Sequence, residues 1–388
     1  MHVLIIPSWY KTDKEPFLGT FFEEQARMLQ RKGIKVGILY PLHQKSFIKS
    51  FTSSFVSRTA FDDKGLYTLY SKTKPWLPTL MGNYLNKIGI VKYAYSSFLA
   101  YCKINGTPDI IHSHSIYWGG VVAHYISQKK TIPFVHTEHL SSLIYTDEYD
   151  KKPLKNYLKT VFANSKRNIF VSHAFEQAMI DKYQVKNSIT IHNVVNPIFF
   201  DNKEIKNNVF SEFYIVNIGR LIKMKNQKTL IQAVNLLYNI LKIKIKLTII
   251  GEGILESQLI EESQIINKNV TIEFISKANR NQIAKYIQRS HVLASSSVFE
   301  TFGLTLAEAI ACGVPVVAYK TMGIDEIMTK ENGIIVSENT PFAFAEALSK
   351  IYYNFAKYDS RKISNDCYSQ FSEDVISKKI IDLYQEIL

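Results

Sequence analysis

Two glutamates, Glu300 and Glu308, lie eight positions apart on either side of a glycine, Gly303. An apolar strand pattern ends near residue 294, and an apolar helical pattern begins at about Gly303. The first N–H groups of a helix have no partner inside it, and together with the helix dipole they attract anions such as a diphosphate. A glycine there lets a phosphate approach the backbone closely. The sequence therefore predicts a diphosphate site at this helix start.

The two carboxylates need their own explanation, because negative charges beside an anion site would repel the anion. Carboxylates accept hydrogen bonds, so diols are suitable partners. We predict that Glu300 is a catalytic residue that binds sugar hydroxyls beyond the phosphates and that Glu308 accepts from a ribose diol. The nucleotide-binding residues predicted in this stretch are Phe302, Gly303, Leu304, Thr305 and Glu308. Without the surrounding motif, two such glutamates would indicate only solvated surface charge.

A basic loop follows the predicted strand 214–218 and contains Gly219, Arg220 and Lys225. In open α/β sheets, ligands bind beyond the carboxyl ends of the strands, where this loop must lie. Both cations can offset the charge that develops on a departing nucleotide diphosphate, and such stabilisation is usually the largest catalytic contribution. We assign both cations to catalysis and all three residues to the nucleotide site. The alternative is a solvated basic loop.

Histidines follow two predicted strands of the first half. His112 and His114 lie at the end of the strand 108–112, and His139 follows the next strand. We predict that His139 is the catalytic histidine, which either hydrogen-bonds a hydroxyl of the donor sugar or helps to move a proton. The alternative is a metal site built from His112, His114, Glu138 and His139. We predict that no metal is bound.

A glycine, Gly19, follows the first predicted strand, 3–6, and opens a predicted helix over 20–32. Glycine there would let the backbone approach a phosphate or an acceptor closely. We include Gly19 among the nucleotide-binding residues.

Short apolar runs rich in β-branched residues alternate with helical patterns along the chain. Continuous apolar runs are typical of strands buried on both faces, which favours parallel sheets covered by helices and an α/β fold. The predicted strands are 3–6, 35–40, 108–112, 133–136 and 169–171 in the first half and 214–218, 246–250, 270–274, 291–294 and 314–318 in the second.

The 388 residues are too many for one compact core and suit two domains. A turn and a polar stretch near 196–208 mark the boundary. We predict an N-terminal domain over 1–200, which binds the acceptor, and a C-terminal domain over 201–372, which binds the nucleotide sugar. Residues 373–388 are predicted to form a last helix that crosses back to the first domain.

Aromatic residues alternate with lysines over residues 43–106. We predict a helical insertion that packs its aromatics inward; the alternative is a basic aromatic surface at a membrane interface. The aromatic and basic residues of this pattern include Phe47, Lys49, Phe51, Phe55, Arg58, Tyr67, Tyr70, Lys72, Lys74 and Trp76.

The bulk composition is that of a globular protein with a net charge of +13. Anionic partners or a compositional bias of the genome would each account for this charge. Three scattered cysteines offer no disulfide framework, and the N-terminus does not resemble a signal peptide. No apolar run is long enough to span a membrane. We expect a cytoplasmic protein, which can associate with the inner face of the plasma membrane, and no recognisable nucleic-acid-binding module.

The motifs resemble those of the family-4 glycosyltransferases, which are retaining enzymes with the two-domain GT-B fold. The resemblance extends over nearly the whole chain, and the stretch from Glu300 to residue 317 is its most specific part. It implies two doubly wound, Rossmann-like domains that face each other across a cleft. It also implies that Arg220 and Lys225 face the donor diphosphate, Glu300 the donor sugar, Glu308 the ribose, and His139 the reaction centre.

The implied activity is transfer of a sugar from a nucleotide-diphosphate sugar to a hydroxyl acceptor, without a cofactor. We expect a UDP-sugar as donor and a lipid-linked saccharide as acceptor, as in capsule or other surface polysaccharide assembly. The alternatives are a nucleotide-sugar epimerase of the same fold and a non-catalytic nucleotide-sugar-binding subunit. Two positions depart from the family pattern: Ser276 replaces a common glycine, and the pair Met322-Gly323 replaces two glycines near the expected sugar pocket.

Overall fold

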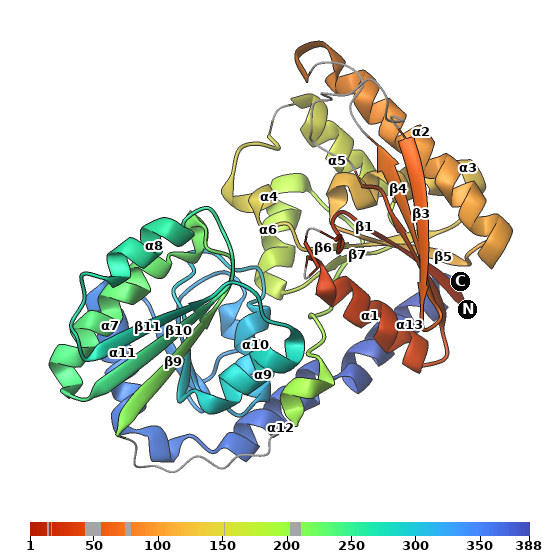
Figure 1. Ribbon diagram of the computed structural model, residues 1–388. Helices are drawn as coiled ribbons and strands as arrows, with labels where there is room; N and C mark the ends of the chain where they lie inside the picture. Colours follow the sequence, from red (N-terminus) through yellow and green to blue (C-terminus); the bar gives the residue numbers. More distant parts are fainter. Residues whose placement is uncertain (14, 17, 43–55, 74–78, 151, 202–210) are drawn as a thin grey trace. The chain divides into compact units, whose positions relative to one another are not determined.

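The computed structural model describes the whole chain except residues 14, 17, 43–55, 74–78, 151 and 202–210 (Figure 1). The described residues form two compact units. Unit 1 contains Met1–Ile191 and Ser377–Leu388, and unit 2 contains His192–Ile376. The last helix, α13 (Glu373–Ile387), therefore begins in unit 2 and ends in unit 1.

Unit 1 is built on one sheet in the order β3-β4-β2-β1-β5-β6-β7-β8, in which every neighbouring pair is parallel except β3 and β4. The strands are β1 (His2–Pro7), β2 (Lys35–Tyr40), β3 (Val56–Asp63), β4 (Leu66–Thr73), β5 (Ile110–His114), β6 (Phe134–Glu138), β7 (Asn168–Phe170) and β8 (Ser188–Thr190). The helices are α1 (Thr20–Arg31), α2 (Thr79–Asn105), α3 (Val121–Lys130), α4 (Ser142–Tyr145), α5 (Lys152–Asn164) and α6 (His173–Tyr183), with a π-helical turn at Ile116–Gly120. Every residue of β1 is buried, as expected of a central parallel strand.

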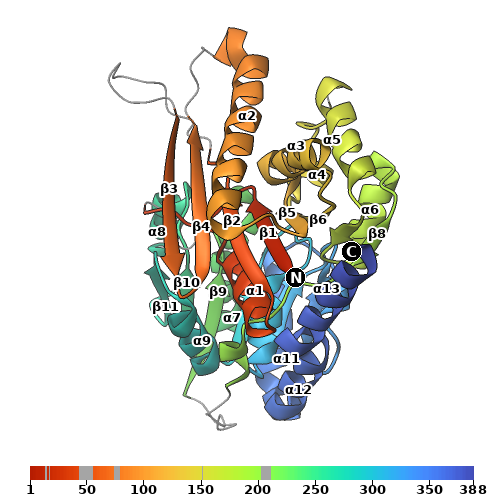
Figure 2. The same ribbon diagram turned by 90° about the vertical axis from the view of Figure 1, so that its right-hand side faces the viewer.

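The region 43–106 differs from its prediction. Thr79–Asn105 is helical, and α2 packs along β4 (Figure 2), but residues 56–73 form a β-hairpin. Lys64 and Gly65 both have positive φ angles, 49° and 78°, which is the backbone of a tight two-residue hairpin turn. The parallel pairing of β4 with β2 then extends the sheet. The other predicted basic and aromatic positions, Phe47, Lys49, Phe51, Phe55, Lys74 and Trp76, lie outside the described residues.

Unit 2 is built on a sheet in the order β11-β10-β9-β12-β13-β14 with all neighbouring pairs parallel. Its strands are β9 (Glu212–Ile218), β10 (Lys244–Ile250), β11 (Val270–Ile275), β12 (Val292–Ser295), β13 (Val316–Tyr319) and β14 (Gly333–Val336). The helices are α7 (Gln227–Leu241), α8 (Glu256–Ser263), α9 (Arg280–Arg289), α10 (Leu304–Ala311), α11 (Pro341–Tyr353) and α12 (Ser360–Phe371). Short 3-10 turns lie at Pro197–Phe200, Lys223–Lys225, Ile324–Glu326 and Phe355–Lys357.

Helices cover both faces of the unit 2 sheet. α7 and α11 pack together on one face, and α9 and α10 lie on the other (Figure 1). α7 packs on the sheet because its helical spacing places Leu230, Val234 and Leu237 on one buried stripe. Among the described residues, no helix is both long and apolar enough to cross a bilayer.

The turn after β10 supports the loop after β9. The Gly219 N–H donates to the Ile250 carbonyl at 3.0 Å, and the Leu221 N–H donates to the Glu252 carbonyl at 2.8 Å. Gly253 lies so close that a Cβ atom there would stand 2.2 Å from the Leu221 carbonyl oxygen. Glycine is therefore required at 253 for a steric reason.

Replacing Gly253 by alanine should destabilise unit 2 by about 1–3 kcal/mol, because backbone atoms of a packed loop must move to admit the methyl group. The matched control is Gly219→Ala, whose Cβ would meet only the Lys225 side chain at an ordinary 3.5 Å. We expect the control to change stability by less than about 0.5 kcal/mol. Urea unfolding followed by circular dichroism measures both; equal losses would contradict the steric explanation.

Candidate active site

The strand order of unit 2 reverses between β9 and β12, and the loops that follow these two strands meet at this point. The Val298 N–H donates to the Met224 carbonyl at 3.0 Å, and the Ser296 hydroxyl donates to the Lys225 carbonyl at 2.9 Å. The Lys225 ammonium forms an ion pair with Oε1 of Glu300. Two residues predicted from separate motifs are thus direct partners at the usual ligand position of such sheets.

The other predicted residues of the β9 loop lie beside this pair. Gly219 lies against the aliphatic part of the Lys225 side chain. Arg220 is exposed, its carbonyl accepts from the Gln227 amide at 3.1 Å, and its guanidinium has no acidic partner among the described residues. One cation of the loop is therefore held by a carboxylate, and the other faces solvent.

The predicted anion site at the start of α10 has the expected backbone. Gly303 caps the helix with a φ of +90°, a conformation that favours glycine. The N–H groups of Leu306 and Ala307 turn back to the Gly303 carbonyl, while those of Leu304 and Thr305 have no partner within the helix. The Phe302 side chain is buried and packs between the rings of His192 and Phe371, so it lies in the core.

Glu308 is almost fully buried, with 1% of its side chain exposed, and its Oε1 forms an ion pair with Arg280 Nη1 at 2.7 Å. The Arg280 guanidinium also lies over the Phe199 ring, 5.0 Å from the ring centre. A diol that binds Glu308 would have to share it with Arg280. Arg280 belongs to none of the predicted motifs; its local signal is the capping box of Asn279 and Gln282 that starts α9 at Arg280.

The loop after β13 packs against the loop that carries Glu300. The Gly323 N–H donates to the Glu300 carbonyl at 3.3 Å, and a Cβ at Gly323 would stand 2.1 Å from the Thr301 carbonyl oxygen. The glycine of the pair Met322-Gly323 is therefore required by packing. This loop fixes the backbone of Glu300 from a second side.

In unit 1, the predicted histidines meet at the carboxyl edge of β5 and β6. His114 Nδ1 lies 3.1 Å from His139 Nε2, and the rings of His112 and His114 stack with their centres 4.2 Å apart. The Nε2 of His112 hydrogen-bonds the Thr137 hydroxyl at 2.7 Å, and its Nδ1 hydrogen-bonds the hydroxyl of Tyr384 on α13. Tyr384 is absent from the predicted site, because 272 positions separate it from its partner His112.

Gly19 lies at the N-terminus of α1 with a φ of +70°, and the next residues of α1 contact the histidines. The ring centres of Phe21 and Phe22 lie 5.0 and 5.4 Å from that of His139. Gly19 is therefore close in sequence to side chains that contact His139. Gly19 and His139 belong to unit 1, and the Lys225–Glu300 pair belongs to unit 2.

Burial keeps these histidines neutral. Desolvation, together with the neighbouring imidazoles, lowers the pKa of His112 to about 3 and holds that of His114 well below its ordinary value. Desolvation also lowers the pKa of His139 to about 4, although Glu138 acts in the opposite direction. Each imidazole therefore carries a single proton at neutral pH.

Glu138 is the buried charge of this region. Burial alone would raise its pKa, but the hydrogen bond and charge of His136 and the Leu140 N–H bring the pKa below its ordinary value. The carboxylate accepts from His136 at 3.2 Å and from the N–H groups of Ile116, His139 and Leu140 at 2.7–2.9 Å. Glu138 therefore anchors the loop that carries His139.

The alternative of a metal site at these histidines has no geometric support. In the part of the chain that the structure describes, no group of three or more His, Cys, Asp and Glu side chains is arranged to hold a metal ion. The nitrogens of His112 are occupied by Thr137 and Tyr384.

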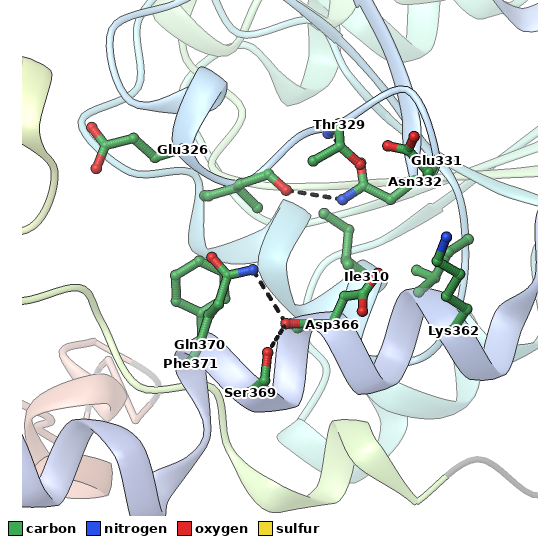
Figure 3. A pocket seen from close by; sticks show the side chains of 13 residues that line it. Ile310, Glu326, Thr329, Glu331, Asn332, Lys362, Asp366, Ser369, Gln370 and Phe371 are labelled. Carbon is green, nitrogen blue, oxygen red and sulfur yellow. Dashed lines mark hydrogen bonds between the residues drawn. The ribbon is translucent and has the colours of Figure 1, made fainter.

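A pocket of about 240 Å3 lies elsewhere in unit 2, between α12 and the segment that leads into β14 (Figure 3). Glu326, Lys362 and Asp366 contribute charged side chains to it. None of the predicted site residues lines this pocket. Glu326 is already bound to His192 at 2.9 Å.

The neutral histidines predict that unit 1 loses stability as the pH falls. Their folded pKa values lie below the unfolded value of about 6.5, so the unfolded chain takes up protons that the folded chain does not. The free energy of unfolding should decrease from about pH 6.5 toward pH 4. His114→Gln should reduce this slope by about 1.4 kcal/mol per pH unit, and the exposed control His173→Gln should not. Denaturant unfolding at several pH values measures the slopes; an unchanged slope in His114→Gln would refute the explanation.

Comparison with known proteins adds independent information. The family model described as Glycosyltransferase Family 4 matches residues 18–198, and the one described as Glycosyl transferases group 1 matches residues 199–364. A Bacillus subtilis glycosyltransferase assigned to teichuronic acid biosynthesis, TuaC, is 23% identical over 100% of this chain and 99% of its own. A Campylobacter jejuni transferase that adds N-acetylgalactosamine to a diphospho-undecaprenol-linked saccharide is 27% identical over 53% of this chain and 58% of its own.

Solved structures agree on the fold. Sucrose-phosphate synthase from Thermosynechococcus elongatus has a TM-score of 0.74 at 17% identity, with 100% of this chain and 99% of that chain covered. HepE of Anabaena in complex with UDP has a TM-score of 0.70 at 16% identity, and both chains are covered completely. The predicted fold class of two Rossmann-like α/β domains, the GT-B fold, is confirmed. The two family models together match residues 18–364, and the chain belongs to glycosyltransferase family 4.

Proposed function

We propose that this glycosyltransferase moves a sugar from a nucleotide-diphosphate sugar to a hydroxyl group, with retention of configuration at the anomeric carbon. The observation that carries the proposal is the Lys225–Glu300 ion pair, formed between the loops that follow the neighbouring strands β9 and β12 and next to the start of α10. Unit 2 takes the donor in this proposal, and unit 1 takes the acceptor.

The charges of unit 2 suit a departing diphosphate. Lys225 and Arg220 supply positive charge, and the Leu304 and Thr305 N–H groups point out of the helix start. Glu300 engages Lys225 through Oε1, and its Oε2 has no partner among the described residues. That oxygen can accept from a sugar hydroxyl while the ammonium of Lys225 neutralises the phosphate.

The ion pair of Glu300 supports a retaining route without a covalent intermediate. Double displacement needs a free carboxylate that attacks the anomeric carbon, and Glu300 is bound to Lys225 instead. We favour a same-face reaction. The acceptor oxygen bonds to the anomeric carbon as the bond from that carbon to the phosphate oxygen breaks, and the acceptor proton passes to the phosphate.

The acceptor proposal draws on the relatives. TuaC is named for teichuronic acid biosynthesis, and the Campylobacter transferase acts on a diphospho-undecaprenol saccharide. We propose a lipid-linked saccharide of surface polysaccharide assembly, such as capsule, reached at the cytoplasmic face of the membrane. A net charge of +13 would favour peripheral contact with an anionic lipid surface.

A UDP-sugar is the proposed donor. Titration calorimetry tests this proposal by measuring the binding of UDP, GDP and ADP, each as the free nucleotide and as its glucose derivative. We expect UDP to bind at least about tenfold more tightly than the other two. Tighter binding of GDP or ADP would show that the proposed UDP-sugar is not the donor. Conversion of the donor sugar into its epimer without an acceptor would indicate an epimerase.

Removing either partner of the Lys225–Glu300 ion pair should slow transfer strongly. Glu300→Gln and Lys225→Ala should each lower kcat about 10²–10³-fold. Lys225→Ala removes positive charge that faces the departing phosphate, and Glu300→Gln removes the carboxylate that pairs with Lys225 and accepts from the sugar hydroxyl. The matched control is the surface pair Lys228–Glu262, whose lysine lies three positions after Lys225. Lys228→Ala and Glu262→Gln should keep near-normal rates. Release of UDP from the donor is the measurement, and normal rates in both site variants would end the proposal.

A further inference from the structure

The hydroxyl of Tyr384 is fully buried in unit 1. Its one hydrogen-bond partner among the described residues is Nδ1 of His112. A buried phenol that donates to nothing leaves an unsatisfied donor, so the O–H points at that nitrogen. Nδ1 of His112 is therefore an acceptor, and the proton of this imidazole lies on Nε2, which donates to the Thr137 hydroxyl at 2.7 Å.

Gln25 of α1 contacts both His112 and His114, and it links the proton position of one ring to that of the other. Its Nε2 lies 3.4 Å from Nδ1 of His112 and 3.5 Å from Nε2 of His114. The single lone pair of Nδ1 of His112 already accepts from Tyr384, so Gln25 makes only a longer, shared contact with it. Because this nitrogen carries no proton that the amide oxygen could accept, the amide turns its N–H groups to this side. The Nε2 of His114 is then also an acceptor, and the His114 proton lies on Nδ1.

The last contact reaches His139. Its Nε2 lies 3.1 Å from Nδ1 of His114, so the His114 proton is donated to it. The Nε2 of His139 must therefore be an acceptor. Because burial keeps His139 neutral, its single proton lies on Nδ1, and this nitrogen has no hydrogen bond to any described residue.

We propose that Tyr384 fixes the proton of His139 on Nδ1, so that His139 offers substrate a hydrogen-bond donor and not a proton acceptor. The side chains that transmit this effect are His112, Gln25 and His114. Tyr384 and Gln25 act as positioning residues. The inference rests on the proposed role of His139 in sugar transfer, and it deepens that proposal because the acceptor proton must then pass to the leaving phosphate.

The tautomer can be read directly by NMR. In protein labelled with 15N-histidine, long-range 1H–15N spectra distinguish a protonated ring nitrogen from one with a lone pair. The His139 signals are identified by their absence in His139→Gln. We expect wild-type protein to show the proton of His139 on Nδ1.

Two variants test the chain of contacts. Gln25→Glu replaces the amide donor by a carboxylate that accepts, so the His114 proton should move to Nε2 and the His139 proton should move to Nε2 as well. Tyr384→Phe should give a mixture of both His139 tautomers and should lower kcat about tenfold with little change in the KM for the donor. The control is Tyr183→Phe, which removes another buried hydroxyl of unit 1, bonded to the Leu143 carbonyl at 3.1 Å, and should leave the His139 signals unchanged.

A wild-type signal with the proton on Nε2 of His139, or an unaltered tautomer in Gln25→Glu, would overturn the proposal. Loss of folding in Tyr384→Phe leaves the wild-type and Gln25→Glu spectra as the test. These spectra need neither donor nor acceptor. If His139→Gln transfers sugar at the normal rate, the proposed role of His139 fails while the tautomer assignment stands.

Discussion

The reversal of strand order between β9 and β12 is the constraint on which unit 2 depends. Parallel pairing brings the ends of these neighbouring strands to one edge of the sheet, and their following loops must then share a small space. Lys225 and Glu300 meet there although 75 positions separate them. Two glycines keep the loops in place, since Gly253 and Gly323 approach backbone oxygens more closely than any side chain would permit. The ion pair is thus a product of sheet topology and close backbone packing.

In unit 1 the constraint is different, because several imidazoles are buried beside one carboxylate. Unpaired polar groups in a core are costly, so each needs a partner. Glu138 obtains four donors, three of them backbone N–H groups of the loops around it. His112 is enclosed by Thr137 and Tyr384. Directed hydrogen bonds of this kind define a single arrangement of the rings, which an apolar cluster would not.

The sequence alone predicted the regular parts of the fold well, because buried parallel strands are continuous apolar runs that a local pattern reveals. Separate motifs also singled out Lys225 and Glu300, which the structure places in contact. The hairpin at residues 56–73 was not predicted. Its strands lack a clear alternation of apolar and polar residues, and β4 is held in register by pairing with β2. Arg280 and Tyr384 were missed because each matters only through a partner far along the chain.

Residues Ser377–Leu388 belong to unit 1, although the whole of unit 2 precedes them in the chain. A ribosome synthesises residues 1–191 without Ile380, Leu383 and Tyr384, which are all buried in the finished unit. Domains commonly begin to fold while the chain is still being made. The nascent N-terminal half must therefore leave the apolar surface that these residues cover exposed until translation has passed through unit 2.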